Sequence, residues 1–377
     1  MSDLSSFIDS VFGASMHLKR LRSLNNAATG VIESGSLAIH AIGAGLAQAN
    51  ELQRKHAIKQ VDRLLSNPAI HLPDLFRDWV PFIVAQRKAI MVSMDWTEFD
   101  ADGHATLVLS LQTEHGRNTP LLWRTCLQSE LKGQRNNEED TLLRQLHACL
   151  PAQVHVTIVA DRGFSDIALY HFIHEGLGFD YVIRMKGNIQ ITDSKGRSGP
   201  VSDWLATDGR ARAVKKARVT RQGYLVEQVI CVQRPGMKSA WYLAASQAEL
   251  APQTVMNMYN RRWGIEYSFR DIKDYKFGMG MAHMHTRSPA RRDRLFLLSA
   301  LSIAFLTLLG KAGDSAGLER TIKVNTVKTR SYSFWRQGCI YYALLPGMRE
   351  EHLIPLMERF AELLHEQTFC RKILAVL

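Results

Sequence analysis

The sequence predicts an α/β fold in which helices flank a mixed β-sheet, with a β-rich insertion and with helical regions at both ends. Three observations support this prediction. The chain has 377 residues, which is too long for one ordinary core and indicates two or three domains. Hydrophobic residues make up 46% of it and charged residues 22%, so most of the chain should be folded. In its middle part, strand-like segments come first and then alternate with segments of helical character.

The first 75 residues or so have helical character. A Gly- and Ala-rich stretch, SGSLAIHAIGAGLAQANELQRKHAIKQVDRLL, would allow helices to approach each other closely. Six basic residues are candidates for phosphate contacts: Lys19, Arg20, Arg22, Arg54, Lys55 and Lys59. A small helical bundle with a solvated basic face is an equally good interpretation of the same residues.

The predicted sheet begins near residue 88. AIMVSMDW, HATLVLSLQT and TPLLWRTCLQ are apolar segments joined by short loops, which predicts three antiparallel strands. A helix is expected at residues 138–150, followed by the strand VHVTIVAD, the helix SDIALYHFIHEGLG and the strand FDYVIRMKGN. This order fits a mixed sheet covered by helices. The ribonuclease H fold has the same order of elements.

Residues 190–245 break this alternation. They are rich in Gly, Ser and basic residues and contain strand-like pieces, so we expect a β-rich insertion. Its basic residues could face DNA or could protect a solvated strand edge: Arg210, Arg212, Lys215, Lys216, Arg218 and Arg221.

Helices are expected in the rest of the chain. The first should run from about Gln253 to Lys276. Near the end, four apolar residues recur at helical spacing: Leu353, Met357, Phe360 and Leu364. That spacing fits an oligomer contact or an ordinary packed helix.

The overall charge favours a polyanionic partner. The formal net charge is +11 and the isoelectric point is about 9.5. Nucleic acid is the commonest partner of so basic a protein. A basic enzyme without such a partner is the alternative.

The cysteines and the apolar segments indicate a cytoplasmic protein. The five cysteines form no CxxC pair: Cys126, Cys149, Cys231, Cys339 and Cys370. A zinc site built on paired cysteines is therefore not expected, and free thiols in a reducing cytosol are the simplest account. The N-terminal residues lack the order of a signal peptide. The longest apolar run, 295–309, is shorter than the roughly 20 residues of a spanning helix, so we expect a buried helix and no membrane partner.

Two aspartates follow apolar strand-like segments. Asp95 ends the run AIMVSM, and Asp161 ends the run VTIVA and precedes Gly163, which could let the backbone turn sharply. If the two strands are neighbours, the carboxylates converge and repel each other unless a cation lies between them. Oxygen ligands of this kind select Mg²⁺ or Mn²⁺. Either aspartate alone could instead cap a turn or a helix.

The segment MYNRRWGIEYSFRDIKDYK supplies a third carboxylate. At about 100° per residue, five polar residues fall on one stripe of a helix: Tyr259, Arg262, Glu266, Arg270 and Lys273. Such a stripe suits a helix that lies along a DNA strand, with its glutamate at the metals and its basic residues on phosphates. The alternative is a solvated helix face with i,i+4 ion pairs between Glu266 and Arg262 or Arg270.

These residues resemble a known family. The pattern Tyr-x2-Arg-x3-Glu-x6-Lys, matched by Tyr259, Arg262, Glu266 and Lys273, is the signature of the insertion-sequence-four family of bacterial DDE transposases. The segments SMDWTEF and ADRGFSD, and the β-rich insertion between the second aspartate and the glutamate, also look like that family. The resemblance covers roughly residues 88–310.

The resemblance implies cut-and-paste transposition. Members bind the terminal inverted repeats of their element and act on double-stranded DNA as dimers with Mg²⁺, for which Mn²⁺ can substitute. They nick the transposon end, form and reopen a DNA hairpin, and join the end to target DNA. In this chain, two ions per active site would be held by Asp95, Asp161 and Glu266, and terminal phosphates by Tyr259, Arg262 and Lys273. Association with the bacterial nucleoid would follow.

The resemblance also implies a division into domains. Residues 1–75 would bind the DNA end, and residues 88–310 would form the catalytic domain with its insertion at about 190–245. Residues 311–377 would form a helical region that could contact a second subunit.

Trp241 resembles the tryptophan of the family's insertion that stacks on a flipped base during hairpin formation. Such stacking is worth roughly 1–3 kcal/mol. Trp241 could instead be a core residue of a strand, with Tyr242 as the exposed aromatic. Arg270 and Lys186 are further candidates for DNA contacts.

Two rival functions remain at this point. Another nuclease of the ribonuclease H fold would share the carboxylates but would not need the basic helix stripe or the insertion. A DNA-binding regulator of the element that has lost catalysis would not need all three carboxylates.

Overall fold

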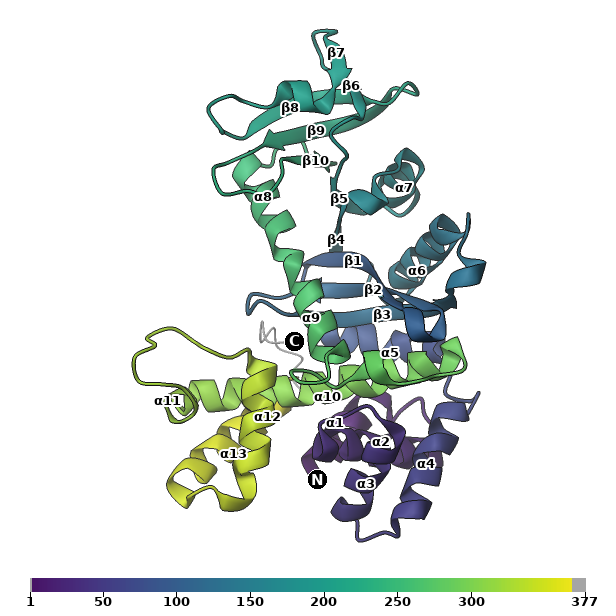
Figure 1. Ribbon diagram of the computed structural model, residues 1–377, viewed down its shortest axis with the longest axis vertical. Coiled ribbons are helices and arrows are strands. Elements are labelled where there is room, and N and C mark those ends of the chain that lie inside the picture. The colour runs from purple at the N-terminus through teal and green to yellow at the C-terminus, as the bar shows by residue number, and fades with distance from the viewer. Residues whose placement is uncertain (1, 368–377) are drawn as a thin grey trace.

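The computed structural model describes residues 2–367 and has three layers of elements around one long helix (Figure 1). The N-terminal helices lie on one side of this helix, the β-sheet lies on the other, and the C-terminal helices pack at one end. Cys370 and the last part of the expected 311–377 region lie outside the described residues.

Within residues 2–367, ten strands form a single sheet. Its strands, in spatial order, are β3 (Asn118–Leu127), β2 (His104–Gln112), β1 (Ala89–Phe99), β4 (His155–Ala160), β5 (Asp180–Arg184), β10 (Trp241–Ala245), β9 (Tyr224–Val232), β8 (Arg212–Val219), β6 (Gln190–Thr192) and β7 (Ser198–Pro200).

The first five strands have the expected order and directions. β1, β2 and β3 form an antiparallel meander, and β4 and β5 then pair parallel with β1 and with each other. Helix α6 (Arg135–Cys149) connects β3 to β4, and α7 (Ile167–His171) with a π-helical turn at Phe172–Gly176 connects β4 to β5. The predicted ribonuclease H-like α/β fold is confirmed by this mixed sheet and its flanking helices.

The strands of residues 190–245 extend the same sheet. β10 pairs antiparallel with β5, with Leu243 opposite Arg184, and β9 and β8 follow outward. The insertion expected from the sequence is therefore continuous with the strands that carry the two aspartates, as the upper half of Figure 1 shows.

The N-terminal helices pack closely through small residues. They are α1 (Ser2–Phe12), α2 (Leu18–Ser34), α3 (Ile39–Ala49), α4 (Arg54–Ser66) and α5 (Leu72–Val84). At Gly30 of α2 a side chain would overlap the carbonyl oxygen of Ile42 in α3, so the backbones of these two helices touch. The expectation that small residues allow close approach is confirmed.

Helix α5 continues past the expected end of the N-terminal helical region near residue 75. It packs under the sheet, where the Trp79 indole N–H donates to the carbonyl oxygen of Pro120 at 2.9 Å and Phe76 meets Trp123 edge to face.

The apolar run 295–309 lies inside α10 (Pro289–Ser315), which is longer than the sequence predicted. By length and composition α10 could cross a membrane, but 89% of its most apolar window is buried inside the protein. Helices α11 (Glu319–Ile322), α12 (Phe334–Leu344) and α13 (Glu350–His365) follow it. α10 is therefore the central core helix around which the layers assemble.

Candidate active site

The first two predicted carboxylates lie side by side. β1 and β4 run parallel, and Met94 of β1 pairs with Ala160 of β4. Asp95 and Asp161 are the next residues, so their Cα atoms are separated by about the spacing of neighbouring strands, roughly 4.8 Å. Asp161 follows directly after the last residue of β4, Ala160, so its carboxylate lies at the end of the strand, as predicted. The prediction that Asp95 ends its strand is wrong, because residues 95–99 continue to pair with β2 as far as Phe99.

The third carboxylate comes from a helix that is interrupted. The expected helix from Gln253 to Lys276 is divided into α8 (Pro252–Arg261) and α9 (Trp263–Lys273). At the break the N–H of Arg262 binds the carbonyl of Tyr259, and the N–H of Ile265 binds the carbonyl of Arg262, so the hydrogen bonds close tighter turns than in an α-helix. In Figure 1 the two helices run from the insertion down past β1.

Helix α9 also ends earlier than expected. Asp274 leaves the helix with an extended backbone, and its carboxylate accepts hydrogen bonds from the backbone N–H groups of Lys276 and Phe277. These bonds hold residues 274–277 in a turn, which is why the helix stops at Lys273.

Arg262 lies between two of the three carboxylates. Its Nη1 is 3.1 Å from Oδ2 of Asp95, and its Nη2 is 2.7 Å from Oε1 of Glu266. The guanidinium is buried, and among the described residues its Nε has no hydrogen-bond partner. The i,i+4 ion pair between Arg262 and Glu266, considered from the sequence as part of a solvated helix face, is thus present, but its guanidinium is buried and also binds Asp95.

The electrostatics of Asp95 reflect this cluster. Burial raises the pKa of Asp95 to about 6, against the lowering influence of the Arg262 guanidinium. The charges of Asp161 and Glu266 raise the same pKa further. Asp161 and Glu266 are therefore close enough to repel the charge of Asp95, and the positive charge beside Asp95 stabilises its ionised form.

Asp161 is held by its own turn. Its Oδ1 accepts a hydrogen bond of 2.7 Å from the N–H of Gly163, at the start of a 3₁₀ turn over Arg162–Phe164. The backbone does turn sharply at Gly163, as predicted, but Gly163 is not among the residues with positive φ, so the turn does not depend on the backbone freedom of glycine. A side chain there would lie 3.0 Å from Oδ1 of Asp161, so the glycine instead leaves room for the carboxylate.

The three carboxylates fit a hard divalent cation by their chemistry, since all the donors are oxygen atoms. As they stand, no three His, Cys, Asp or Glu residues within residues 2–367 are grouped closely enough to hold a metal ion. Arg262 supplies the positive charge between Asp95 and Glu266. A cation bound by both carboxylates would have to take over the contacts that Arg262 makes.

Two other residues of the predicted stripe, Tyr259 and Lys273, contact the sheet. Tyr259 is buried, and its ring meets the ring of Trp241 edge to face at 4.9 Å. Nζ of Lys273 donates to Oγ1 of Thr97 at 3.1 Å and to the carbonyl oxygen of Glu98 at 2.7 Å. Burial lowers the pKa of Lys273. Both residues therefore already have protein contacts, Tyr259 with β10 and Lys273 with the strand that carries Asp95.

The remaining predicted DNA-contacting residues differ in exposure. Trp241 is half-buried at the start of β10 and Tyr242 is buried, so Trp241 is the more accessible aromatic of the pair. Lys186 is exposed just after β5. Arg270 is exposed on α9, with its guanidinium 5.7 Å from the centre of the Tyr267 ring.

Glu139 lies beside the site, and no pattern in the sequence pointed to it. The indole N–H of Trp96 donates to Oε1 of Glu139 in α6 at 2.9 Å, and the backbone N–H of Trp96 donates to Oδ1 of Asp95. Glu139 is buried, which raises its pKa to about 7. Glu139 stands in an acidic stretch of sequence, EEDT, where nothing distinguishes it from its less buried neighbours Glu138 and Asp140.

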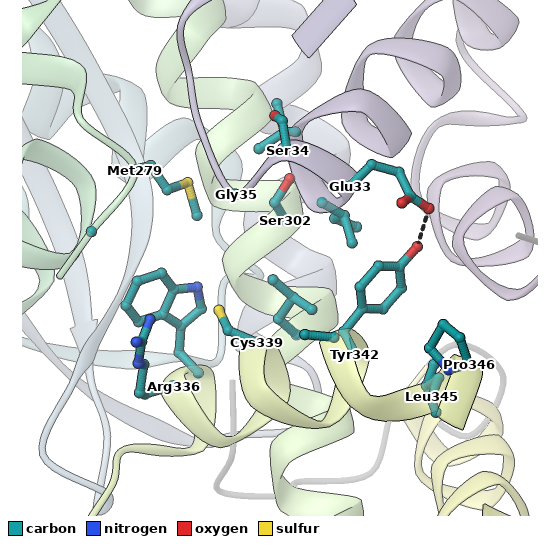
Figure 2. Close-up of a pocket in the computed structure, with 16 residues that line it drawn as sticks. Glu33, Ser34, Gly35, Met279, Ser302, Arg336, Cys339, Tyr342, Leu345 and Pro346 are labelled. Atoms are coloured by element: carbon teal, nitrogen blue, oxygen red, sulfur yellow. Dashed lines mark hydrogen bonds between the residues drawn. The ribbon is translucent and has the colours of Figure 1, made fainter. Parts of the chain in front are cut away.

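A separate cavity of about 590 Å³ lies away from the carboxylates (Figure 2). It is bounded by α2, α10, α12 and the loop at Gly278 and Met279. Across it, the hydroxyl of Tyr342 donates to Oε1 of Glu33 at 2.6 Å. The cavity lies where the N-terminal and C-terminal helices meet around α10.

Comparison with known families agrees with this fold. Residues 124–304 match the family model described as the transposase DDE domain. The match covers slightly less than half of the chain; it includes Asp161 and Glu266 but begins after Asp95. No curated protein matches the chain.

The ribonuclease H-like sheet and this match together support a DDE transposase, an enzyme of DNA transposition and recombination. Such enzymes use divalent metal ions to cut DNA.

Proposed function

We propose that this DDE transposase binds the terminal inverted repeats of a mobile element, cleaves them through a hairpin intermediate, and joins the ends to target DNA. The observation that carries the proposal is the arrangement of Asp95, Asp161 and Glu266 around Arg262. Asp95 and Asp161 lie on adjacent parallel strands, and Arg262 joins Asp95 to Glu266.

The three carboxylates would be the metal ligands. Two Mg²⁺ ions, for which Mn²⁺ would substitute, would stabilise the attacking and the leaving oxygen of an in-line displacement at phosphorus. Asp95 is suited to this role because its ionised form needs a nearby positive charge. Asp161 is suited because its turn holds the carboxylate at the strand end.

Arg262 would have a different partner when DNA is bound. A single phosphate group offers the guanidinium two acceptor oxygens, which could replace the one oxygen of Asp95 and the one oxygen of Glu266 that it binds here. Moving to the phosphate would release Asp95 and Glu266 and neutralise the DNA. Tyr259 and Lys273, on the same stripe, would hold the neighbouring terminal phosphates, and Arg270 and Lys186 would contact DNA further out.

The hairpin-forming, insertion-sequence-four subtype is supported by two features. The first is the Tyr259, Arg262, Glu266 and Lys273 pattern on α8 and α9. The second is Trp241, whose partly exposed ring lies against Tyr259 and would stack on a base displaced when the strand bends sharply. A homodimer that pairs two DNA ends is part of the same proposal, with the C-terminal helical region as its contact and residues 1–75 as the end-binding part.

A cleavage assay tests the proposal. The protein and its Asp95→Ala, Asp161→Ala and Glu266→Ala variants would be incubated with a labelled duplex carrying the element's end, in Mg²⁺ and in EDTA. We expect a metal-dependent nick that matures into a hairpin, with cleavage lost and DNA binding kept in each variant. Robust cleavage by any of the three would overturn the metal assignment.

The role of Trp241 needs a separate measurement. We expect Trp241→Ala to slow hairpin formation more than first-strand nicking, because only the hairpin step displaces a base. A Tyr242→Phe variant, altered at the adjacent buried ring, is the control. Equal slowing of both steps would remove the proposed role.

A DNA-binding regulator without catalysis is the second candidate, and one observation favours it: Arg262 takes up the position between two of the carboxylates. Another nuclease of the same fold is the third. DNA that is retarded in a native gel but remains uncut in Mg²⁺ and Mn²⁺ would select the regulator. Cleavage that ignores the element's end sequence would select the general nuclease.

A further inference from the structure

A buried polar network joins α9 to the strand that carries Asp95. Ser268 of α9, Asn118 at the start of β3 and Ser93 of β1 are all buried. Polar groups buried this deeply reduce stability unless they are hydrogen-bonded, so the bonds between them favour one geometry. Ser268 is hydrogen-bonded to Asn118 and Asn118 to Ser93, and together the three residues form a continuous path from the helix to the sheet.

The first link joins the helix to β3. Oγ of Ser268 accepts from the backbone N–H of Asn118 at 3.0 Å and lies 2.8 Å from the Asn118 carbonyl oxygen. The same oxygen is 2.9 Å from the carbonyl of Gly264, one turn earlier. Since a hydroxyl has a single proton, it donates to one of these two carbonyls at a time. The contact with the Asn118 N–H exists in either case.

The second link joins β3 to β1. Nδ2 of Asn118 donates to Oγ of Ser93 at 2.9 Å, and Nε2 of Gln112 in β2 donates to the same oxygen at 2.9 Å. Ser93 stands two residues before Asp95, and residues two apart on a strand point to the same face of the sheet. The network therefore ends on the strand face from which Asp95 projects.

A steric contact sets the distance between helix and sheet. At Gly264 a side chain would overlap Oδ1 of Asn118, whose side chain is buried and bonded to Ser93. The backbone of α9 thus rests directly on Asn118. Glu266 lies midway between Gly264 and Ser268, the two points at which the helix touches that residue.

We propose that Ser268 and Asn118 are positioning residues that hold Glu266 at a set distance from Asp95 and thereby govern the affinity of the site for divalent cations. This inference rests on the proposed function of the carboxylates as metal ligands. Residues that orient metal ligands typically contribute about 10- to 100-fold to metal affinity.

The test measures Mn²⁺ binding directly, by the electron paramagnetic resonance signal of free Mn²⁺. The full-length protein would be titrated with duplex DNA of the element's end present. Specific binding is the difference between each protein and the Glu266→Ala variant under the same conditions. Thermal unfolding in EDTA would be recorded for every variant.

A matched pair of variants separates positioning from stability. Ser268→Ala and Ser299→Ala each remove a buried helical hydroxyl that bonds a carbonyl of its own helix, but Ser299 lies in α10 and only Ser268 also bonds β3. We expect Mn²⁺ affinity to fall about tenfold or more in Ser268→Ala and to stay unchanged in Ser299→Ala. Ser268→Thr, which keeps the hydroxyl, should recover most of the loss.

A second pair of variants tests the steric contact. Gly264→Ala should weaken Mn²⁺ binding because the new methyl group pushes α9 away from Asn118. In an Asn118→Ala background the same change should have little further effect, because the atom it would meet is gone. Equal effects in both backgrounds would show that Gly264 does not act through Asn118 and would overturn this part of the inference.

The outcomes distinguish this inference from the proposed function. If the wild-type protein binds no more Mn²⁺ than Glu266→Ala, the carboxylates are not metal ligands and the proposed function fails. If the wild type shows specific binding and Ser268→Ala keeps it while losing thermal stability, the network is structural only. That second result would overturn the positioning role and leave the proposed function intact.

Discussion

Replacing Arg262 by methionine should destabilise the metal-free protein and should do so less when a divalent cation is present. The change keeps most of the apolar stem but removes the charge between Asp95 and Glu266. These two carboxylates would then lie close to Asp161 with no cation beside them. A metal ion held by the carboxylates would replace the missing charge.

The magnitude follows from how deeply the ion pairs are buried. Removing one partner of a fully buried ion pair lowers the free energy of unfolding by about 3–5 kcal/mol. The Arg262 side chain is 5% exposed and that of Asp95 20%, but that of Glu266 is 41% exposed, so solvent screens its share. We therefore expect a loss of about 2–3 kcal/mol in EDTA. A cation at 100 times its dissociation constant would return about 2.7 kcal/mol.

The assay is urea unfolding followed by tryptophan fluorescence, in EDTA and in saturating Mg²⁺. Lys323→Met is the matched control, because it breaks an i,i+4 ion pair with Glu319 (2.8 Å). This pair is largely shielded from solvent and lies in α11 and the loop after it, away from the three carboxylates. The control should lose the same stability in both conditions. An Arg262→Met variant that lost as much in Mg²⁺ as in EDTA would refute the idea that a cation takes over the contacts of Arg262.

Three further predictions concern residues away from Asp95, Asp161 and Glu266. Burial raises the pKa of Asp293 to about 7, so ionisation opposes folding increasingly as the pH rises from about 4 to 7 and fully above that. In Asp293→Asn the amide oxygen can still accept the hydrogen bond from the backbone N–H of Thr125. This variant should therefore be more stable by about 1–2 kcal/mol at pH 8, less than the full pKa shift would give, because solvent reaches part of the residue. Its gain at pH 5 should be smaller in urea titrations, and an equal gain at both pH values would contradict the assignment. Tyr342→Phe should cost about 1 kcal/mol through the lost bond to Glu33, and a double-mutant cycle with Glu33→Gln should show coupling; additive losses would exclude the bond as the cause. Gly338→Ala should cost at least about 2 kcal/mol, because the new Cβ would overlap the Leu306 carbonyl where α12 crosses α10; an unchanged thermal midpoint would rule out this close contact.

Much of the catalytic half of the fold could be predicted from sequence because its strands are short apolar runs with turn residues between them. AIMVSM and VTIVA each have the length and composition of a buried strand, and the two strands of a strand–helix–strand unit, here β3, α6 and β4, normally run parallel. Since β1 and β3 point the same way in the antiparallel meander, β1 and β4 are expected to run parallel, which puts Asp95 and Asp161 at the same end of the sheet. That β1 and β4 are neighbours did not follow from these segments, because it depends on the order of the strands in the sheet. The local pattern did not reveal that β1 continues past Asp95, because Asp95 interrupts the apolar run and two of the next four residues, Thr97 and Glu98, are polar.

Contacts between distant segments could not be predicted in the same way. The pairing of β10 with β5 leaves no trace in either strand, so the insertion was expected without its place in the sheet. Helical periodicity continues through Arg262, and only the tighter hydrogen bonds of the folded chain reveal the break. Periodicity placed Arg262 beside Glu266, but its second partner, Asp95, comes from a strand far away in sequence and depends on how α9 docks.

The continuity of the ten-stranded sheet has a geometric consequence. Neighbouring strands in a sheet are rotated by about 20–25° relative to each other. Five such steps separate β1 from β8, which amounts to a turn of roughly 100–125° between the strand that carries Asp95 and the strand that carries Arg212 and Lys215. A straight ligand that lies along the strands at one end of this sheet is therefore not aligned with the strands at the other end. A ligand that touches both must curve with the sheet, or else two separate segments of it must meet the two ends.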